Sequence, residues 1–306
     1  MQLRFHTLDV FTDEAFGGNP LGVFPDAAHL PTALMQKIAR QMNLSETVFL
    51  GPPETEGGTA RVRIFTPAVE VPFAGHPTVG SAIFLAGRGA GERIGAADAA
   101  TLVLEENVGP VTVDVSFRGG RPVFARFTTA ILPEHRPCPH DAADLAAMVG
   151  LELGDVLTDG LAPEMVSCGL PYLIVPVRGL DAISRAALDT VRWRSLVADS
   201  WAHHVYLVCP EAEGEGVDYR VRMFAPGSGV PEDPATGSAA AALGGYLSRV
   251  DGSRDAELSW KVEQGVECGR PSLLFVEADR AGGATAAVRV GGAAVEVSEG
   301  TMTIPG

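Results

Sequence analysis

The sequence has little positive charge, no closely paired cysteines and no long hydrophobic run, and each of these absences excludes a class of function. Its 306 residues hold 23 Lys and Arg against 38 Asp and Glu, a formal net charge of -15 at pH 7. A negative long-range field repels polyanions, so neither nucleic acid nor an anionic membrane surface is expected as a partner. No apolar run approaches the roughly 18 residues of a membrane span, and no signal segment opens the chain. The sequence therefore predicts a cytoplasmic protein.

The cysteines and histidines are too scattered to predict a metal site. No two of the four cysteines have the CxxC spacing that begins many zinc sites, and we interpret all of them as ordinary buried or free thiols: Cys138, Cys168, Cys209 and Cys268. Of the seven histidines only His203 and His204 are adjacent, and neighbours on a strand point to opposite faces. We expect no metal, and the pattern predicts no role for these two histidines.

What the chain does contain is an internal repeat. Residues 63–82 read R-I-F-T-P-A-V-E-V-P-F-A-G-H-P-T-V-G-S-A, and residues 222–239 read R-M-F-A-P-G-S-G-V-P-E-D-P-A-T-G-S-A. Arg63 and Arg222 lie 159 residues apart, and after a two-residue deletion His76 and Asp233 lie 157 apart. A repeat distance near half the chain implies two similar domains. We predict one domain over 1–130, joined by the C-terminal segment 294–306, and a second over 131–293.

Strand patterns dominate both halves. The clearest helix is predicted over 31–42, where Leu34, Ile38 and Met42 form one apolar stripe, and weaker helices over 141–148 and 180–188. Residues 87–100 are expected to be a surface connection and 133–139 a linker. Strands are predicted over 2–10, 22–24, 47–50, 61–65, 102–105, 111–117, 172–177, 205–209, 219–224, 272–277 and 286–290.

Each copy of the repeat ends by entering a helix of small residues. No charge follows Asp233 until Arg249, and a helix that is apolar all round must be enclosed. Asp233 is predicted as the N-cap with Pro234 in the first helical position, and Pro77 plays that part after His76. If the two helix starts face one cleft, their unpaired N–H groups can hold a carboxylate. We therefore expect a small carboxylate-containing substrate.

Two other enzyme classes are disfavoured by their motifs. The glycines at 17–18 and 227–229 do not complete the G-x-G-x-x-G pattern of dinucleotide binding. No nucleophile elbow of the form G-x-S-x-G surrounds Ser45, Ser81 or Ser238, so a serine hydrolase is not indicated.

Five strings, in order along essentially the whole chain, resemble the PhzF family of phenazine biosynthesis proteins. They are G-N-P-L-G-V-F (18–24), N-L-S-E-T-V-F (43–49), F-A-G-H-P-T-V-G (73–80), E-D-P-A-T-G-S-A-A (232–240) and G-R-P-S (269–272). The resemblance implies an α+β, diaminopimelate-epimerase-like fold. Two pseudo-symmetric domains, each a β-sheet rolled around a central helix, would enclose the active site in the cleft between them. It also implies a homodimer and no cofactor.

The resemblance implies site residues as well. In the family's phenazine-pathway isomerase, a glutamate of the S-E-T motif moves a proton on trans-2,3-dihydro-3-hydroxyanthranilate. That position is Glu46 here, with His76 and Asp233 flanking the substrate as further catalytic residues. The expected substrate contacts are Asn19, Ser45, Gly75, Gly237 and Ser238. More distant relatives that racemise amino acids place a cysteine at each helix start. This chain has Gly-His-Pro and Asp-Pro-Ala there, which disfavours a two-thiol mechanism.

The residues themselves support a catalytic role for Glu46 without excluding simpler ones. Between an amphipathic helix and an apolar strand its carboxylate can be partly desolvated, which raises the pKa toward neutrality. The simpler alternatives are a solvated loop glutamate, a satisfied turn histidine at His76 and an ordinary cap at Asp233. We predict a cofactor-independent isomerase that moves a proton on a small carboxylic or amino acid. An epimerase or racemase of non-cysteine type and a catalytically silent ligand-binding protein remain open.

Overall fold

The computed structural model describes residues 1–93 and 98–304, and their contacts divide the chain into two compact units. The first unit contains Met1–Thr128 together with Gly291–Gly306, and the second contains Thr129–Val290. Strands β1 (Gln2–Val10) and β19 (Ala294–Thr303) pair antiparallel along their whole length, which fixes the C-terminal strand to the first unit.

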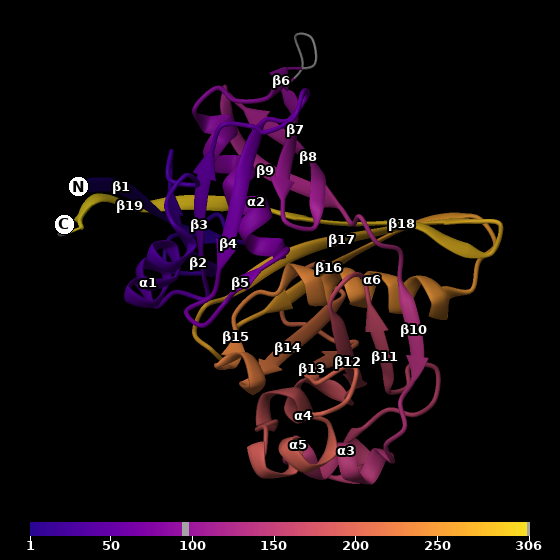
Figure 1. The fold of residues 1–306 in the computed structure, drawn as a ribbon. Coiled ribbons are helices and arrows are strands. Elements are labelled where there is room, and N and C mark those ends of the chain that lie inside the picture. Colours follow the sequence, from indigo (N-terminus) through magenta and orange to yellow (C-terminus); the bar gives the residue numbers. More distant parts are fainter. Residues whose placement is uncertain (94–97, 305–306) are drawn as a thin grey trace. The chain divides into compact units, whose positions relative to one another are not determined.

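Helices and strands alternate irregularly in the first unit (Figure 1). After β1 and before β19 its elements are β2 (Asn19–Phe24), α1 (Thr32–Met42), β3 (Glu46–Gly51), β4 (Ala60–Phe65), β5 (Glu70–Val71), α2 (Gly75–Gly87), β6 (Glu92–Arg93), β7 (Ala99–Glu106), β8 (Gly109–Arg118) and β9 (Arg121–Thr128). Strand β2 pairs antiparallel with β1 and parallel with β3, and β4 joins β3 antiparallel.

The two helices of this unit pack on opposite faces of the sheet. Helix α2 contacts β1, β2, β3, β7, β8, β9 and β19 and is buried along nearly all of its length. A Cβ added at Gly80 would lie 2.6 Å from Leu21 Cδ2 and 2.8 Å from Val10 Cγ2, so the close approach of this helix to β1 and β2 requires glycine. Helix α1 instead packs through Met35 and Ile38 on a phenylalanine cluster that includes Phe24, three positions beyond Leu21 and therefore on the other face.

The second unit repeats this plan with more helices. Its elements are β10 (Glu134–Pro137), α3 (Ala142–Met148), the 3-10 turn η1 (Leu153–Asp155), β11 (Glu164–Ser167), β12 (Pro171–Pro176), α4 (Gly179–Arg185), α5 (Thr190–Leu196), β13 (His204–Cys209), β14 (Tyr219–Ala225), the 3-10 turn η2 (Pro226–Ser228), β15 (Val230–Asp233), α6 (Gly237–Asp251), β16 (Ala256–Gln264), β17 (Ser272–Ala281) and β18 (Ala284–Gly292).

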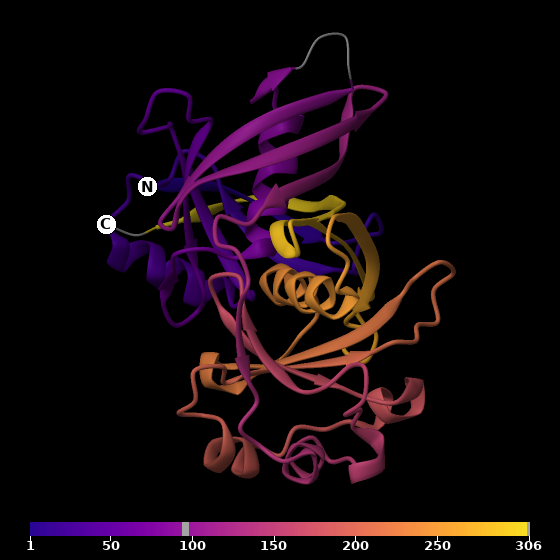
Figure 2. The ribbon, with the colours of Figure 1, turned by 90° about the vertical axis from the view of Figure 1, so that its right-hand side faces the viewer.

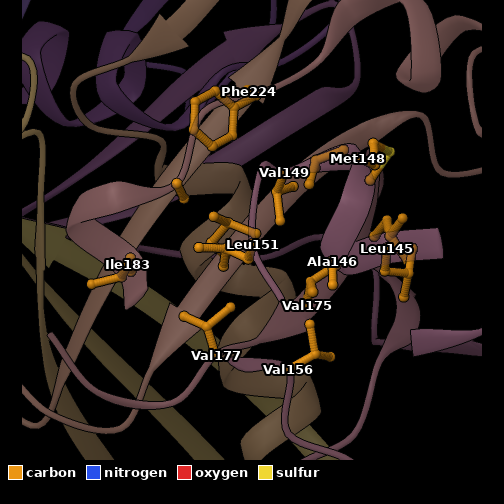
Figure 3. Packing of buried hydrophobic residues seen from close by; sticks show 14 of the residues in the cluster. Leu145, Ala146, Met148, Val149, Leu151, Val156, Val175, Val177, Ile183 and Phe224 are labelled. Carbon is orange, nitrogen blue, oxygen red and sulfur yellow. The ribbon is translucent and has the colours of Figure 1, made fainter. Parts of the chain in front are cut away.

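Side chains along the central strands of the second unit point alternately to the two faces of the sheet, and each face has its own buried cluster. Alternate residues of β12 and β13, such as Leu173 and Val205, join a buried cluster with residues of α3, α4 and α5 (Figure 3). The intervening residues, Tyr172 among them, face α6, which contacts β11, β12, β16 and β17 and appears as an orange coil in Figure 2. The enclosure predicted for this small-residue helix is confirmed, since almost every residue from Gly237 to Ser248 is buried.

The predicted helix starts are wrong in both copies. Asp233 is not an N-cap: its backbone belongs to β15 and pairs with Met223, so α6 begins only at Gly237 after Thr236. Helix α2 begins at Gly75, which leaves Pro77 in its third position rather than its first. In each copy the helix begins four residues after the last residue of a short paired strand, β5 or β15.

The connections also differ in part from the sequence-based expectation. The linker predicted over 133–139 contains β10, which pairs with β11. The connection predicted over 87–100 contains the short strand β6 and the first residues of β7, and its residues 94–97 lie outside those that the structure describes. None of the helices in the described ranges is long and apolar enough to cross a membrane.

Candidate active site

In the first unit, Glu46 and His76 are brought into contact from two elements. Asn43, in the left-handed conformation with φ of 53°, ends α1 and turns the chain into β3, whose first residue is Glu46. His76 lies in the first turn of α2. The Oε2 atom of Glu46 lies 3.4 Å from Nε2 of His76, and the two side chains are 18% and 4% exposed. A carboxyl group and an imidazole therefore meet at a place that is nearly closed to water.

The imidazole of this pair is neutral near pH 7. Burial lowers the pKa of His76 to about 3 because the charged form loses its hydration. An ionised Glu46 would act in the opposite direction, but burial is the dominant cause here. The Glu46–His76 contact is therefore one between a carboxyl group and a neutral ring, not a salt bridge.

The other first-unit residues of the expected site lie at the same end of the sheet. Asn19 is the buried first residue of β2 and pairs with Val10 of β1. It lies two positions before Leu21, the β2 residue that pairs with Glu46 of β3. Ser45 immediately precedes Glu46 and is half-buried. Gly75 is the first residue of α2, directly before His76. The amino ends of the parallel strands β2 and β3 and the start of α2 thus carry all five predicted residues of this half.

In the second unit, Asp233 is held by a buried hydrogen-bond network. Its Oδ2 accepts a hydrogen bond of 2.5 Å from the Thr236 hydroxyl. The Gln264 amide donates to the Asp233 carbonyl at 2.8 Å, and the Thr236 amide donates to Gln264 Oε1 at 3.2 Å. Asp233, Thr236 and Gln264 are at most 8% exposed. The network fixes the segment between β15 and α6, so the carboxylate has a defined place although it is not a cap.

Backbone contacts from β16 and β17 hold the same segment. The Ser272 hydroxyl donates to the Pro234 carbonyl at 3.0 Å. Gly265 adopts φ of +79°, and a Cβ there would lie 2.5 Å from that carbonyl oxygen. A side chain at 265 would therefore displace the chain that carries Asp233.

Ser238 and two buried tyrosines add polar groups to the second half of the expected site. Ser238 follows Gly237 at the start of α6, and its Oγ lies 2.6 Å from the Tyr172 hydroxyl. Tyr206 lies in register with Met223, which pairs in turn with Asp233. Its buried hydroxyl has no hydrogen-bond partner among the described residues. Burial, together with the charges of Tyr172 and Asp233, raises the pKa of Tyr206 well above its usual value.

Sequence reasoning missed Tyr172, Tyr206 and Gln264 as neighbours of the site. The only signal was their occurrence in strands next to the repeat, where the matching first-half positions Leu21 and Phe49 are apolar. Recognising them requires the strand register, which short apolar strands do not reveal.

His203 and His204 play different structural parts. His204 is buried on β13, its Nε2 lies 3.1 Å from the Ser228 hydroxyl, and burial lowers its pKa to about 4. His203 occupies the repeat position of Glu46 and accepts a hydrogen bond from the Trp193 indole through its carbonyl. Neither histidine is therefore held as Glu46 is, against the start of its helix.

None of the four cysteine thiols has a lowered pKa that would activate it. Burial raises the pKa of Cys168 and of Cys268 to about 12, and the Cys168 thiol donates to the carbonyl of Ala241. Burial also raises the pKa of Cys138 and of Cys209. Because the thiolate is the nucleophile, all four are poorly suited to thiol chemistry near neutral pH.

One group of potential metal ligands escaped the sequence analysis because its members lie at opposite ends of the chain. His6 Nδ1 lies 2.6 Å from Glu296 Oε1 and 3.9 Å from Glu299 Oε2 across the β1–β19 pair. The Arg88 guanidinium lies 3.3 Å from Glu296 and 3.4 Å from His6 Nδ1. Because the positively charged Arg88 guanidinium already lies beside these side chains, we interpret the group as an ion-pair cluster.

Comparison with known proteins gives likenesses over nearly the whole chain. The family model of phenazine biosynthesis-like proteins matches residues 8–300. An uncharacterised isomerase of Mesorhizobium japonicum is 44% identical over 99% of this chain and 100% of its own length. A trans-2,3-dihydro-3-hydroxyanthranilate isomerase of Pseudomonas fluorescens is 37% identical over 97% and 98%. The crystal structure of a Bacillus anthracis PhzF-family protein has a TM-score of 0.87 at 27% identity, covering 99% and 100%. The expected α+β fold of this type is confirmed.

Proposed function

The chain belongs to the phenazine biosynthesis-like protein family and is an isomerase, and we propose that it moves a proton within a small carboxylic or amino acid without a cofactor. The observation that carries the proposal is the contact of 3.4 Å between the Glu46 carboxyl and the buried imidazole of His76. It provides one group able to take and return a proton, beside a second group that stays uncharged.

In this reaction Glu46 is the general base and then the general acid. Its carboxylate removes a proton from a substrate carbon, the electron pair moves into the adjacent π system, and the protonated carboxyl, after exchanging its proton with solvent, delivers one proton to a different carbon. The atoms of substrate and product are therefore the same, and no oxidant or reductant is needed. A positioned general base contributes about 10²–10⁴-fold to the rate.

His76 serves as a neutral hydrogen-bonding partner in this proposal. With its pKa lowered to about 3 by burial, it adds no positive charge that would hold Glu46 ionised and weaken it as a base. Its ring can donate a hydrogen bond to the carboxylate or to a polar group of the substrate. The rise predicted for the pKa of Glu46 stays a prediction.

We assign the remaining residues to substrate binding. The first backbone amides of a helix have no partner within that helix, so those near Gly75 and those near Gly237 and Ser238 can donate to a substrate carboxylate. Asn19 and Ser45 are proposed as further polar contacts. Asp233 is proposed to accept a hydrogen bond from an amino or hydroxyl group of the substrate, since its carboxylate is held in place by Thr236.

The Pseudomonas relative suggests the first substrate to try, trans-2,3-dihydro-3-hydroxyanthranilate. We propose related small amino and hydroxy acids as the wider class. We also propose a homodimer, on the resemblance of the sequence to the family alone, and light scattering on the purified protein measures its mass directly.

Incubation of the protein in D₂O with a panel of these acids tests the function. An isomerase gives a product with one deuterium on a carbon other than the one that lost its proton. An epimerase places the deuterium on the same carbon with inverted configuration. A silent binding protein shifts the melting temperature without exchange. Binding without deuterium uptake anywhere in the panel would contradict the proposed function.

A further inference from the structure

The internal repeat makes Glu106 the counterpart of Gln264. Strand β7 runs parallel to β4 with Glu105 beside Arg61, and β16 runs parallel to β14 with Glu263 beside Arg220. Arg61 and Arg220 are 159 residues apart, the same distance as Arg63 and Arg222 in the repeat. Both pairs of strands therefore belong to the repeat, although the sequence comparison did not reach β7 or β16.

The contacts of Glu105 and Glu263 confirm this register. Glu105 accepts hydrogen bonds from the backbone amides of Glu54 and Thr55, in the loop between β3 and β4. Glu263 accepts them from the amides of Glu213 and Gly214, in the loop between β13 and β14. Since these two glutamates accept equivalent hydrogen bonds in the two units, the residues that follow them, Glu106 and Gln264, are equivalent.

Gln264 and Glu106 each contact the start of the central helix of their own unit, α6 and α2 respectively. Gln264 binds the backbone and side chain of Thr236 and the carbonyl of Asp233. Glu106 Oε1 lies 2.6 Å from the hydroxyl of Thr78, in the first turns of α2 and two residues after His76. One position of the repeat thus carries an amide in one half and a carboxyl group in the other, and a protonated carboxyl group has the same shape as an amide.

The hydrogen-bond geometry at Thr78 agrees with a protonated Glu106. The Thr78 hydroxyl oxygen also lies 2.8 Å from the carbonyl of Ala74, one helical turn back. A hydroxyl has one proton and can donate to only one of these two oxygens. If it donates to Ala74, then Glu106 must supply the proton of the other bond.

The surroundings of Glu106 disfavour its charge. It is 5% exposed, its Oε2 has no hydrogen-bond partner among the described residues, and burial raises its pKa to about 8. Arg61 on β4 is the charged group that acts to lower the pKa of Glu106. Its guanidinium, however, donates to the carbonyls of Val62 and Glu105 and to the Asn107 side chain rather than to Glu106. The group that faces it from α2 is the Thr78 hydroxyl, which carries no charge.

We propose that Glu106 is protonated in the working enzyme and positions the first turns of α2, and with them His76, as the Gln264 amide positions the segment that carries Asp233. Glu106 acts through Thr78 and is a positioning residue, not one that touches substrate. Its ionisation places a charge beside the helix start with Oε2 buried and without a partner among the described residues, and the cost of burying that charge destabilises this conformation. The effect on turnover rests on the proposed function, whereas the protonation state does not.

Three readouts test the proposal. The infrared difference spectrum between wild type and Glu106→Gln should show the C=O band of a protonated carboxyl at pH 6, lost as the pH rises through about 8. The folded protein holds a proton that the unfolded chain releases near 4.5, so the stability that Glu106 contributes, measured as the difference between wild type and Glu106→Gln, should fall as pH rises from about 4.5 to 8. The exposed control Glu56→Gln, compared with Glu106→Gln in the same way, should keep both the band and the slope.

Turnover supplies the third readout. Glu106→Gln should support exchange at pH 7 and lack the alkaline decline expected of the wild type above about pH 8. Glu106→Ala should lower kcat by at least about tenfold, because a misplaced catalytic group is costly. Absence of the infrared band from the difference spectrum at pH 6, or an unchanged stability slope or alkaline decline in Glu106→Gln, would overturn the proposal. The first two measurements need no substrate, so they stand even if no exchange is found.

Discussion

Oε2 of Glu46 lies 3.4 Å from Nε2 of His76, and both side chains are largely withdrawn from water. The contact joins the first residue of β3 to the first turn of α2, two elements that the sequence separates by a hairpin. It brings the residue proposed to move the proton beside an uncharged partner, and the stability of that arrangement depends on pH in a definite direction.

His76 should make the protein less stable in acid. Its pKa is about 3 when folded and near 6.5 when unfolded, so the unfolded state takes up a proton first as the pH falls. The stability it contributes is present above about pH 6.5 and is lost between about 6.5 and 3, with a slope of at most about 1.4 kcal/mol per pH unit. Urea unfolding of the wild type and His76→Gln across this range measures the slope. Equal slopes in the two proteins would show that His76 titrates alike in both states.

Asp233 should be needed for turnover more than for folding. In Asp233→Asn the side-chain oxygen can still accept the Thr236 hydroxyl bond, so thermal stability should change by less than about 1 kcal/mol. The loss of charge should lower kcat/KM by more than about tenfold if the carboxylate binds a polar group of the substrate. Asp233→Ala should lose stability as well. Unchanged turnover in the Asn variant would leave Asp233 with a structural role only.

Gly80 should tolerate no larger side chain. A Cβ there meets Leu21 and Val10 at 2.6 and 2.8 Å, so Gly80→Ala should destabilise the protein by about 1–3 kcal/mol. Gly87, at the end of the same helix, has room, since its nearest contact is Pro122 Cγ at 3.5 Å. Gly87→Ala should therefore be neutral or up to about 1 kcal/mol stabilising. Comparable losses in chemical denaturation of the two variants would contradict this reading of the packing.

The repeat and the apolar helix after Asp233 made much of the fold predictable. Both features are local patterns of residue size and order, and the strand over Gln2–Val10 was predicted with the bounds that it has. Helix α5 and strands β9, β11, β16 and β19 were missed. Strand β19 pairs with β1 at the other end of the chain, whereas β16, in which Leu258, Trp260 and Val262 alternate with polar residues, carried a signal that the prediction overlooked. The helix start at Asp233 was wrong because strand pairing with Met223 outweighed a favourable capping sequence.

The residues of the candidate site were also predictable only in part. Glu46 and His76 stood in motifs that can be read from the sequence. Gln264 and Glu106 could not be found from it, because each acts through a buried hydrogen bond that exists only in the folded register. Their roles became visible when the two units were compared with each other.

The most direct test of the account is deuterium exchange by Glu46→Gln. The variant and its exposed control Glu56→Gln are incubated in D₂O with an acid that the wild type labels, and uptake is followed by mass spectrometry. We predict that Glu46→Gln folds and still binds the acid but loses exchange by about 10²–10⁴-fold, while Glu56→Gln matches the wild type. Exchange by Glu46→Gln at the wild-type rate would show that Glu46 does not move the proton.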